Sequence, residues 1–270
     1  MITSLANEKV KYARSLLRRR ARWQEGRFLV EGVRLIEEAL RAGCIPALVF
    51  FAPEVLADSR GAALHERCRA LGVDCFPASP EVVASLSDTV TPQGVVAVVP
   101  FPLPLQPASV GLLVVVDGLR DPGNLGTLLR AAAAAGVGRV LLGPGTADPY
   151  NPKVVRSAMG AHFRLTPEAL SWAGIAQAVR GHRVWLADPR GETRYDRVDW
   201  REASALIIGG EAAGAGAEAA ALATGRVAIP LARDVESLNA AVAASVILFE
   251  AARQRWVASG APFPSYVMSS

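Results

Sequence analysis

The sequence predicts an α/β protein whose larger part is a doubly wound parallel sheet with helices on both faces. Short, almost wholly apolar runs alternate with helical stretches through the second half of the chain, as a sheet covered on both faces requires. The segment PFPLPLQPAS holds four prolines, so it can continue neither a helix nor a central strand, and it divides the chain. With 270 residues and 51% hydrophobic residues, the chain is long enough to build two packed cores.

The part before the proline-rich segment is predicted to be a small α/β domain. Residues 7–42 are interpreted as two helices separated near Gly26. The apolar runs PALVFFA, VDCFPA and GVVAVVP follow as predicted strands, with helices between them over residues 61–71 and 80–87. We therefore expect a first domain over residues 1–100 and a stiff linker over residues 101–109.

The alternating pattern restarts after the linker. The predicted strands are LLVVVD, RVLLG, RVWLAD, ALIIGG and RVAIP, and the predicted helices cover residues 125–135, 152–160, 217–223 and 238–256. They define a second domain over residues 110–258, followed by a tail over residues 259–270. A ligand of such a sheet binds at the carboxyl ends of the strands, so we expect the chemistry in the turns that follow them.

Positive charge is concentrated near the N-terminus. Residues 1–42 hold ten Lys or Arg against five Asp or Glu, a net charge of +5, whereas the whole chain carries +4. Five arginines crowd the first predicted helix and its exit: Arg18, Arg19, Arg20, Arg22 and Arg27. Such a run is usually a solvated helix face. The other interpretation is a surface that neutralises the phosphates of a nucleic acid.

Other classes of site find no support in the sequence. Cys44, Cys68 and Cys75 have neither an even count nor CxxC spacing, and the three histidines show no metal-ligand spacing, so we expect no disulfide framework and no metal. No P-loop or GxSxG turn is present. The longest apolar stretch, residues 240–249, is far shorter than the roughly 20 residues of a membrane helix. The first residues lack the pattern of a secretory signal, so we expect a cytoplasmic protein that does not bind membranes.

The first strand-to-helix junction of the second domain covers residues 116–130. Pro122, Gly123 and Asn124 form a turn in which Asn124 is predicted to be the N-cap of the next helix. Arg130 lies six positions further on, nearly two helical turns away. A capping asparagine and a solvated arginine would explain this spacing without any function, so both interpretations stay open at this point.

Two later junctions have the same form. Asn151 precedes Pro152 and is predicted to cap a helix that has proline at its first position. The third junction is bipartite, with glycines after the strand in IIGGEAAG and with ESLN opening the last helix. Glycines permit a ligand to approach the backbone closely, so a flat and partly apolar molecule would suit this place. A dinucleotide fingerprint, G-x-G-x-x-A, also fits residues 214–219, which keeps an oxidoreductase as a weak alternative.

Taken together, the three junctions resemble the three signature motifs of the SpoU (TrmH) branch of the SPOUT methyltransferases. The resemblance covers residues 114–255 and is carried by DPGNLGTLLRAAAAAGV, by NPKVVRSAMGA, and by GGEAAG with VAIPLARDVESLNAAVAASVILFEAARQR. The N-terminal part, from ITSLANEKVKYAR to QGVVAVV, is similar to the family's ribosomal-protein-L30e-like substrate-binding domain. One departure is the run Arg130-Ala131-Ala132-Ala133, where many relatives have a polar or acidic residue.

The resemblance implies a fold and a reaction that the residue pattern alone does not suggest. It implies an α/β knot, in which a parallel sheet with helices on both faces ends in a deep C-terminal trefoil knot. It also implies a homodimer with the last helix at the interface, where Ile247, Leu248 and Phe249 would form an apolar face. The implied activity is methylation of a ribose 2′-hydroxyl with S-adenosylmethionine, in ribosomal RNA in preference to transfer RNA. A non-catalytic RNA-binding protein of the same fold is the other alternative.

The residues implicated by this resemblance fall into three groups. Those expected to act in catalysis are Asn124, Arg130, Glu211, Ser237 and Asn239. Those expected to bind the cofactor are Gly209, Gly210, Gly214, Ile229 and Leu238. The arginines expected to bind RNA are Arg18, Arg19, Arg20, Arg22 and Arg27. Because a guanidinium keeps its proton in nearly every protein setting, we expect Arg130 to stabilise developing negative charge and not to act as a base.

Overall fold

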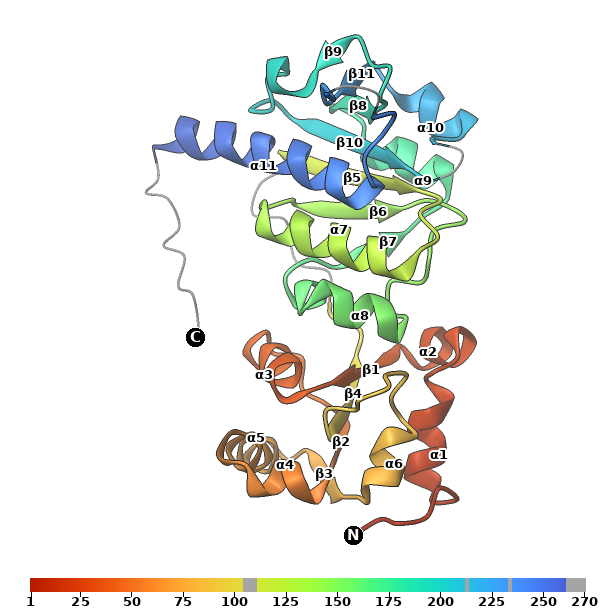
Figure 1. Ribbon diagram of the computed structural model, residues 1–270, viewed down its shortest axis with the longest axis vertical. Helices are drawn as coiled ribbons and strands as arrows, with labels where there is room; N and C mark the ends of the chain where they lie inside the picture. Colours follow the sequence, from red (N-terminus) through yellow and green to blue (C-terminus); the bar gives the residue numbers. More distant parts are fainter. Residues whose placement is uncertain (104–110, 212–213, 233–234, 261–270) are drawn as a thin grey trace. The chain divides into compact units, whose positions relative to one another are not determined.

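The computed structural model describes residues 1–103, 111–211, 214–232 and 235–260 (Figure 1). The chain forms two compact units, each drawn from several stretches of sequence. The first unit contains Met1–Leu105, Asp121–Arg130 and Ala147–Thr166, and the second contains Gln106–Arg120, Ala131–Thr146 and Pro167–Ser270. Most of the predicted linker and most of the predicted tail lie outside the described residues. The domain boundaries expected from the sequence stay predictions.

The first unit is built on a mixed four-stranded sheet. Its strands are β1 (Arg27–Glu31), β2 (Leu48–Phe51), β3 (Asp74–Pro77) and β4 (Val95–Pro100), in the spatial order β1-β4-β2-β3. β4 pairs antiparallel with β1 and β2, and β2 pairs parallel with β3. The helical elements are α1 (Glu8–Ser15), α2 (Arg19–Glu25), α3 (Val33–Arg41), α4 (Pro53–Ala57), α5 (Ser59–Ala70), α6 (Pro80–Ala84), α8 (Pro152–Ala158) and the 3-10 turn η1 (Ala161–Phe163). The first turns of α7 (Pro122–Ala134) also belong to this unit.

Alternate side chains of this sheet fill two separate cores. Phe50 and Val98 pack on the face covered by α1 and α6, whereas Phe51 and Val99 pack on the face covered by α3 and α5 (Figure 1). Three side chains from residues 147–166 join the second of these cores: Tyr150, Val155 and Phe163. A segment that follows the predicted linker therefore completes the first unit.

The expectation of two helices separated near Gly26 is only partly correct. The stretch before that glycine is divided into α1 and α2, and the stretch after it forms β1 before α3 begins. β1 pairs with β4 so that Arg27 lies opposite Pro100. Gly26 and Gly32 flank the strand with φ angles of 59° and 98°, a backbone conformation that favours glycine. The pairing partner is distant in sequence, so local periodicity could not reveal the strand.

A buried ion pair joins α2 to the segment before α8 within the first unit. Arg22 is 2% exposed and Asp148 is 8% exposed. The Nε and Nη2 groups of Arg22 donate to Oδ2 of Asp148, with Nε at 3.1 Å, and Nη1 donates to the carbonyl oxygen of Leu16 at 2.8 Å. Oδ1 of Asp148 accepts from Trp23 Nε1 at 3.1 Å and from the backbone nitrogen of Tyr150 at 3.2 Å. Both charges are thus removed from water and satisfied by protein groups.

His162 is buried in the first unit, and this burial opposes its protonation. The ring is 1% exposed, and its Nε2 lies 2.7 Å from the carbonyl oxygen of Pro149. Because a carbonyl oxygen only accepts, Nε2 carries the proton of the neutral ring. Burial lowers the pKa of His162 to about 4, against smaller opposing effects from the Pro149 hydrogen bond and the Asp148 charge. The unfolded chain therefore takes up a proton at a higher pH than the folded chain does.

We expect the free energy of unfolding to fall as the pH drops from about 6.5 to about 4, because protonation of His162 favours the unfolded chain over this interval. The contribution of this one group is about 3 kcal/mol across the interval. His162→Gln keeps a donor for Pro149 but does not titrate. Urea unfolding at a series of pH values should therefore give a flatter profile for His162→Gln below pH 6.5, and parallel profiles for the two proteins would contradict the assignment.

The second unit contains a seven-stranded sheet, and all pairings among its described strands are parallel. The strands are β5 (Leu112–Asp117), β6 (Arg139–Leu142), β7 (Pro167–Ala169), β8 (Arg183–Ala187), β9 (Thr193–Arg194), β10 (Ser204–Gly209) and β11 (Gly225–Ala228). Their spatial order is β7-β6-β5-β10-β8-β11-β9. The predicted parallel sheet is confirmed. β7 and β9 were not predicted, because strands of three and two residues carry no alternation.

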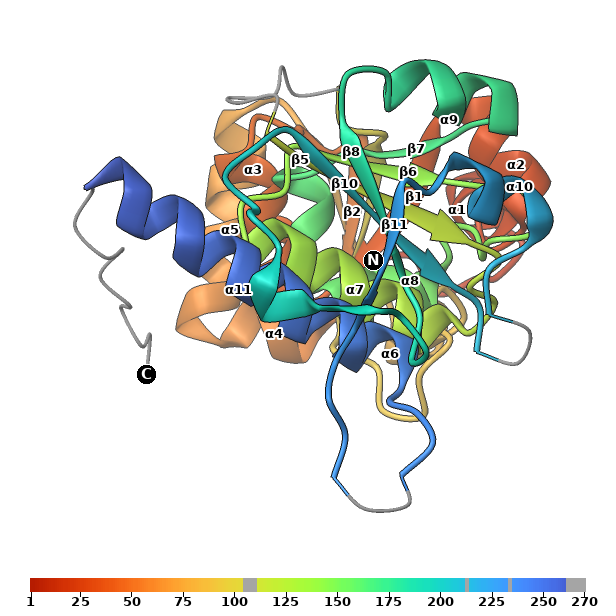
Figure 2. The same ribbon diagram turned by 90° about the horizontal axis from the view of Figure 1, so that it is seen from above.

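Helices cover both faces of this sheet, as predicted. α9 (Trp172–Ala178) and α10 (Ala217–Leu222) pack on one face against Leu113, Val115 and Ile207. α11 (Ala240–Ser259) contacts β10 and the 3-10 turn η2 (Tyr195–Arg197) from the opposite face (Figure 2). Among the described residues, no helix is both long enough and apolar enough to cross a membrane.

Candidate functional site

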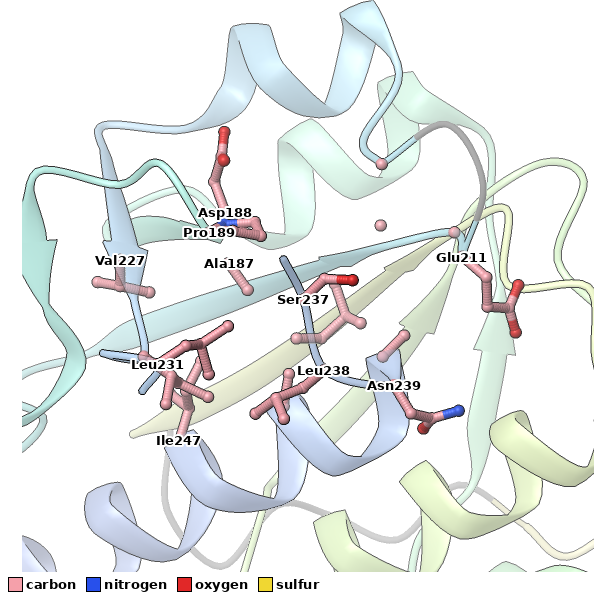
Figure 3. A pocket seen from close by; sticks show the side chains of 17 residues that line it. Ala187, Asp188, Pro189, Glu211, Val227, Leu231, Ser237, Leu238, Asn239 and Ile247 are labelled. Atoms are coloured by element: carbon pink, nitrogen blue, oxygen red, sulfur yellow. The ribbon is translucent and has the colours of Figure 1, made fainter. Parts of the chain in front are cut away.

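A pocket of about 470 Å³ lies at the carboxyl ends of three parallel strands of the second unit. β8 ends at Ala187, β10 at Gly209 and β11 at Ala228, and most of the lining residues lie at these ends or just after them. Residues 237–240, which lead into α11, form another wall (Figure 3). The pocket occupies the edge of the sheet at which the sequence predicted a ligand. Its volume is in the range that cofactors and small ligands fill.

The pocket is apolar at one end and polar at the other. Val227 and Leu231 lie at the apolar end, and Glu211 and Asn239 lie at the polar end (Figure 3). The described lining contains two carboxylates and neither lysine nor arginine. One of these carboxylates, Asp188, is paired with Arg226 at 2.8 Å, and the other, Glu211, belongs to the polar end. Such a lining favours a ligand that combines apolar surface with positive charge, and it disfavours phosphates.

Bare backbone forms the pocket wall at the end of β10. A Cβ atom on Gly209 would lie 2.5 Å from the backbone nitrogen of Ala215, and one on Gly210 would lie 2.8 Å from the carbonyl oxygen of Gly118. Gly210 and Gly214 exchange two backbone hydrogen bonds of 3.1 Å. The φ angle of Gly214 is +66°, which a residue with a side chain rarely adopts. The sequence therefore uses glycine here because only glycine permits this tight return of the chain.

Two side chains fix the borders of the pocket. Asp117, at the end of β5, accepts a hydrogen bond of 2.6 Å from the backbone nitrogen of Gly216, which anchors the turn that follows β10. Asn239 is the N-cap of α11, and its Oδ1 accepts from two backbone N–H groups of the first turn at 3.0 and 3.2 Å. Asn239 therefore lines the pocket and starts the helix at the same time.

The structure brings most of the predicted site residues together. Eight of the ten residues expected to act in catalysis or to bind the cofactor line this pocket: Glu211, Ser237, Asn239, Gly209, Gly210, Gly214, Ile229 and Leu238. The other two, Asn124 and Arg130, lie on α7 in the part of the helix that belongs to the first unit, and neither lines the pocket. The side chain of Arg130 is exposed.

The expectation that Asn124 caps α7 is wrong. The helix begins at Pro122, and Asp121 supplies the cap because its Oδ1 accepts from the backbone nitrogen of Asn124 at 2.8 Å. This hydrogen bond, helped by the nearby Lys153, lowers the pKa of Asp121. Proline suits the first helical position, where a backbone N–H would have no partner within the helix. Capping therefore does not explain why residue 124 is asparagine. In α8, by contrast, the predicted cap Asn151 is confirmed.

The N-terminal arginines differ in their surroundings. Arg18, Arg19 and Arg20 are exposed, and none of them takes part in an ion pair among the described residues. Arg27 is half-buried and donates to the Tyr12 hydroxyl at 3.0 Å. The assignment of Arg22 to RNA binding is wrong, because its guanidinium is buried against Asp148. A run of arginines in the sequence does not show which of their side chains are buried.

Sequence reasoning missed part of the pocket. Asp188 and Pro189 line it directly after β8, and their signal was present, because a polar residue followed by proline ends the strand RVWLAD. Ala243 and Ile247 line it from α11 through the way the helix packs, and no local pattern marks them. Among the described residues, no cluster of His, Cys, Asp or Glu could hold a metal ion.

Two family models match the chain. Residues 111–249 match the SpoU rRNA Methylase family, and residues 7–97 match the MRM3-like substrate binding domain. An uncharacterised tRNA/rRNA methyltransferase of Synechocystis sp. is 38% identical, with 96% of this chain and 95% of the relative covered. The 23S rRNA (guanosine(2553)-2′-O)-methyltransferase RlmP of Bacillus subtilis is 33% identical, with 92% of this chain and 97% of the relative covered.

Solved structures share the fold over nearly the whole chain. The SpoU methyltransferase AviRb from Streptomyces viridochromogenes, in complex with AdoMet, superposes with a TM-score of 0.82 at 30% identity. The similarity covers 92% of this chain and 98% of that one. An AdoMet-bound rRNA methyltransferase from Sinorhizobium meliloti gives the same TM-score and identity, with 93% of this chain and 97% of that one covered.

Proposed function

Because the chain belongs to the SpoU rRNA methylase family, we propose that it methylates a ribose 2′-hydroxyl of ribosomal RNA with S-adenosylmethionine as methyl donor. The observation that carries this proposal is the pocket at the ends of β8, β10 and β11, which is lined by residues of the third signature motif. The AdoMet-bound neighbours of the same fold support the choice of cofactor.

The pocket suits S-adenosylmethionine in both shape and charge. When bound, this cofactor supplies a methyl group on a positively charged sulfonium. The apolar side chains and bare strand-end backbone suit a flat adenine ring, and the described lining holds two carboxylates and neither lysine nor arginine. A dinucleotide would place its phosphates in a described lining without lysine or arginine, so this lining does not favour the oxidoreductase alternative.

Gly209→Ala should raise the dissociation constant for S-adenosylmethionine by about 5- to 150-fold, because overpacking typically costs 1–3 kcal/mol. The added methyl group would overlap the backbone of Gly214 and Ala215, so the turn must open to admit it. Isothermal titration calorimetry measures the constant. Gly174→Ala in α9 is the matched control, because its Cβ would meet neighbours at an ordinary 3.5 Å. Equal affinity of the two variants would contradict the role of Gly209.

The residues of this chain divide between holding the cofactor and acting on RNA. Ser237 and Asn239 fix the cofactor side, since Asn239 also anchors the start of α11. Arg130 would stabilise the negative charge that develops on the 2′-oxygen as its proton passes to solvent water, and Asn124 would orient Arg130 or the ribose. The remaining residues assigned to the cofactor are Gly209, Gly210, Gly214, Ile229 and Leu238.

Ribosomal RNA is the proposed substrate because the N-terminal part matches the MRM3-like substrate binding domain and RlmP is named for a 23S rRNA product. Mass-spectrometric mapping of 2′-O-methyl groups in cells with and without the protein tests this. We expect one ribosomal nucleotide to lose its methyl group, and the purified protein with S-adenosylmethionine to restore it. A loss confined to transfer RNA, or no loss, would overturn the proposal.

We also propose that the C-terminal segment completes a trefoil knot. Support comes from α11, the last element in the described chain, which is bound to the connection between β9 and β10 and to the residue before β5. Gln254 Nε2 donates to the carbonyl oxygen of Val198 at 3.0 Å, and Arg255 Nη2 donates to those of Glu202 and Gly111 at 2.8 and 2.5 Å. A crystal structure traces the path directly, and an unknotted trace would refute the proposal.

A homodimer formed through α11 is proposed from its exposed apolar stripe. Val242 and Phe249 are 46% and 45% exposed and lie seven residues apart, on one helix face. Ile247 and Leu248 do not belong to this stripe, contrary to the sequence-based expectation, because they are buried in the second unit's core. Phe249→Glu should convert dimer to monomer in sedimentation equilibrium, whereas the same change at the fully exposed Val90 should not. A wild-type monomer would overturn the proposal.

The cytoplasm is the compartment proposed for the protein. A ribosomal RNA substrate and three free cysteines suit a reducing compartment that contains ribosomes. Fractionation of cells that express a tagged chain tests this, and recovery outside the cytoplasm would contradict it.

A further inference from the structure

An exposed tryptophan stands among the basic residues of the first unit. Trp23 is 41% exposed on α2, one helical turn after Arg19 and Arg20, so the three side chains share one face of the helix. Arg22 occupies the buried face of the same helix. With Arg18, these residues form a surface that presents an aromatic ring beside three guanidinium groups without ion-pair partners among the described residues. We call Arg18, Arg19, Arg20 and Trp23 the α2 surface.

The ring of Trp23 is held in its exposed position. Its Nε1 donates to Asp148 Oδ1 at 3.1 Å, and that carboxylate is itself fixed by Arg22. The ring packs nearly perpendicular to Phe101 and Tyr150, with centroid distances of 5.3 and 6.0 Å. A single exposed apolar residue is common on protein surfaces and needs no explanation. A ring anchored through its only polar atom, and bordered by cations that pair with none of the described carboxylates, is a different arrangement, because its exposure is built into the fold.

We propose that Trp23 is a stacking platform for an unpaired base of the RNA substrate, with Arg18, Arg19 and Arg20 neutralising the adjacent phosphates. This inference rests on the proposed function, because it takes RNA to be the partner. An aromatic ring stacks on the face of any unpaired base, whereas bases inside a duplex have both faces covered by their neighbours. The cationic residues favour a polyanion over a protein partner of ordinary charge. The α2 surface thus selects unpaired nucleotides of the RNA.

The test compares two fluorescein-labelled RNA probes of equal length: a hairpin with an unpaired loop and a blunt duplex. Fluorescence anisotropy with the full-length protein gives the dissociation constants. We expect the wild type to prefer the hairpin and Trp23→Ala to weaken hairpin binding about tenfold, with duplex binding changed less than about twofold. Trp23→Phe loses the Nε1 hydrogen bond but keeps a ring, so it should stay close to the wild type. This variant separates stacking from the contact with Asp148.

Fluorescence adds a direct readout. Stacking of the loop base should quench part of the tryptophan emission of the wild type, and Trp23→Phe should bind the hairpin without that part of the quenching. Leu71→Ala is the matched control, because it removes another exposed apolar side chain, 46% exposed, from the first unit. The triple variant Arg18→Ala, Arg19→Ala and Arg20→Ala should bind both probes more weakly, and its affinity should depend less on salt concentration. Calorimetry should show the same affinity for S-adenosylmethionine in every variant.

Three outcomes would overturn the inference. In the first, Trp23→Ala binds the hairpin as tightly as the wild type does. In the second, Trp23→Ala loses the same affinity for the hairpin and for the duplex. In the third, the wild type does not bind the hairpin more tightly than the duplex. Methylation of isolated ribosomal RNA is measured on the same preparations. If the wild type methylates this RNA while one of these outcomes holds, the stacking role fails and the proposed function stands. If the wild type neither methylates nor binds RNA, both fail, and a protein ligand for the α2 surface becomes the alternative.

Discussion

Replacing Arg22 with leucine should lower the free energy of unfolding by about 3–5 kcal/mol, the largest loss of stability that we expect from one substitution. The change leaves the Asp148 carboxylate buried at 8% exposure without its cation. Asp148→Leu should have a similar effect, because it strands the guanidinium. Chemical denaturation followed by circular dichroism measures both variants.

A double variant and a surface control make this prediction specific. Arg22→Leu combined with Asp148→Leu should lose clearly less stability than the sum of the two single variants, because neither charge is left alone. Arg60→Leu removes a partner of Glu37 that lies 2.6 Å away at the surface, and it should have a much smaller effect. If Arg22→Leu is no more damaging than Arg60→Leu, the buried pair does not have the role assigned to it.

Arg130→Ala should lower kcat for methylation of ribosomal RNA by about 100- to 1000-fold, the loss typical when one group that stabilises an oxyanion is removed. Because Arg130 is exposed and does not line the pocket, stability and S-adenosylmethionine affinity should not change. Arg130→Lys should recover part of the rate, since it keeps the positive charge but loses the planar fork. Single-turnover kinetics with saturating RNA and cofactor separate this effect from binding.

The control for Arg130 is Arg180→Ala, which removes another exposed arginine two residues after the end of α9. It should leave kcat within about twofold of the wild type, as expected for an exposed surface substitution. Full turnover of the ribosomal RNA substrate by Arg130→Ala would contradict the catalytic role of Arg130. A pH–rate profile adds a further distinction, because a base at position 130 would make the rate of Arg130→Lys follow the ionisation of the new amine.

The fold could be predicted where the signals are local. The apolar runs of β5, β6, β8, β10 and β11 and the cap of α8 were all recognised, because strand burial and helix capping depend on neighbouring residues. β1 was missed because its partner β4 is distant in sequence. α9 was missed as well, although Ser171 accepts from Gly174 as an ordinary cap.

The pocket could be predicted because turns that follow parallel strands meet at one edge of a sheet. The glycines after β10 and the ESLN segment before α11 therefore came together without knowledge of the packing. The knowledge that they bind a cofactor came from the resemblance and not from the spacing. The burial of Arg22 could not be foreseen, because its partner Asp148 lies 126 residues further along the chain.

The ion pair between Arg22 and Asp148 also ties the folding of the first unit to the order of synthesis. Residues 1–105 leave the ribosome before residues 147–166, which supply Asp148, Tyr150 and Phe163 to the same unit. At typical rates of translation the intervening stretch takes about 2–8 s to make. During that time Arg22 of the nascent chain lacks its counter-ion Asp148, and the core of the first unit lacks Tyr150 and Phe163. Chaperones recognise such incompletely packed chains. A ribosome that stalls within this window therefore leaves an N-terminal part that cannot finish folding.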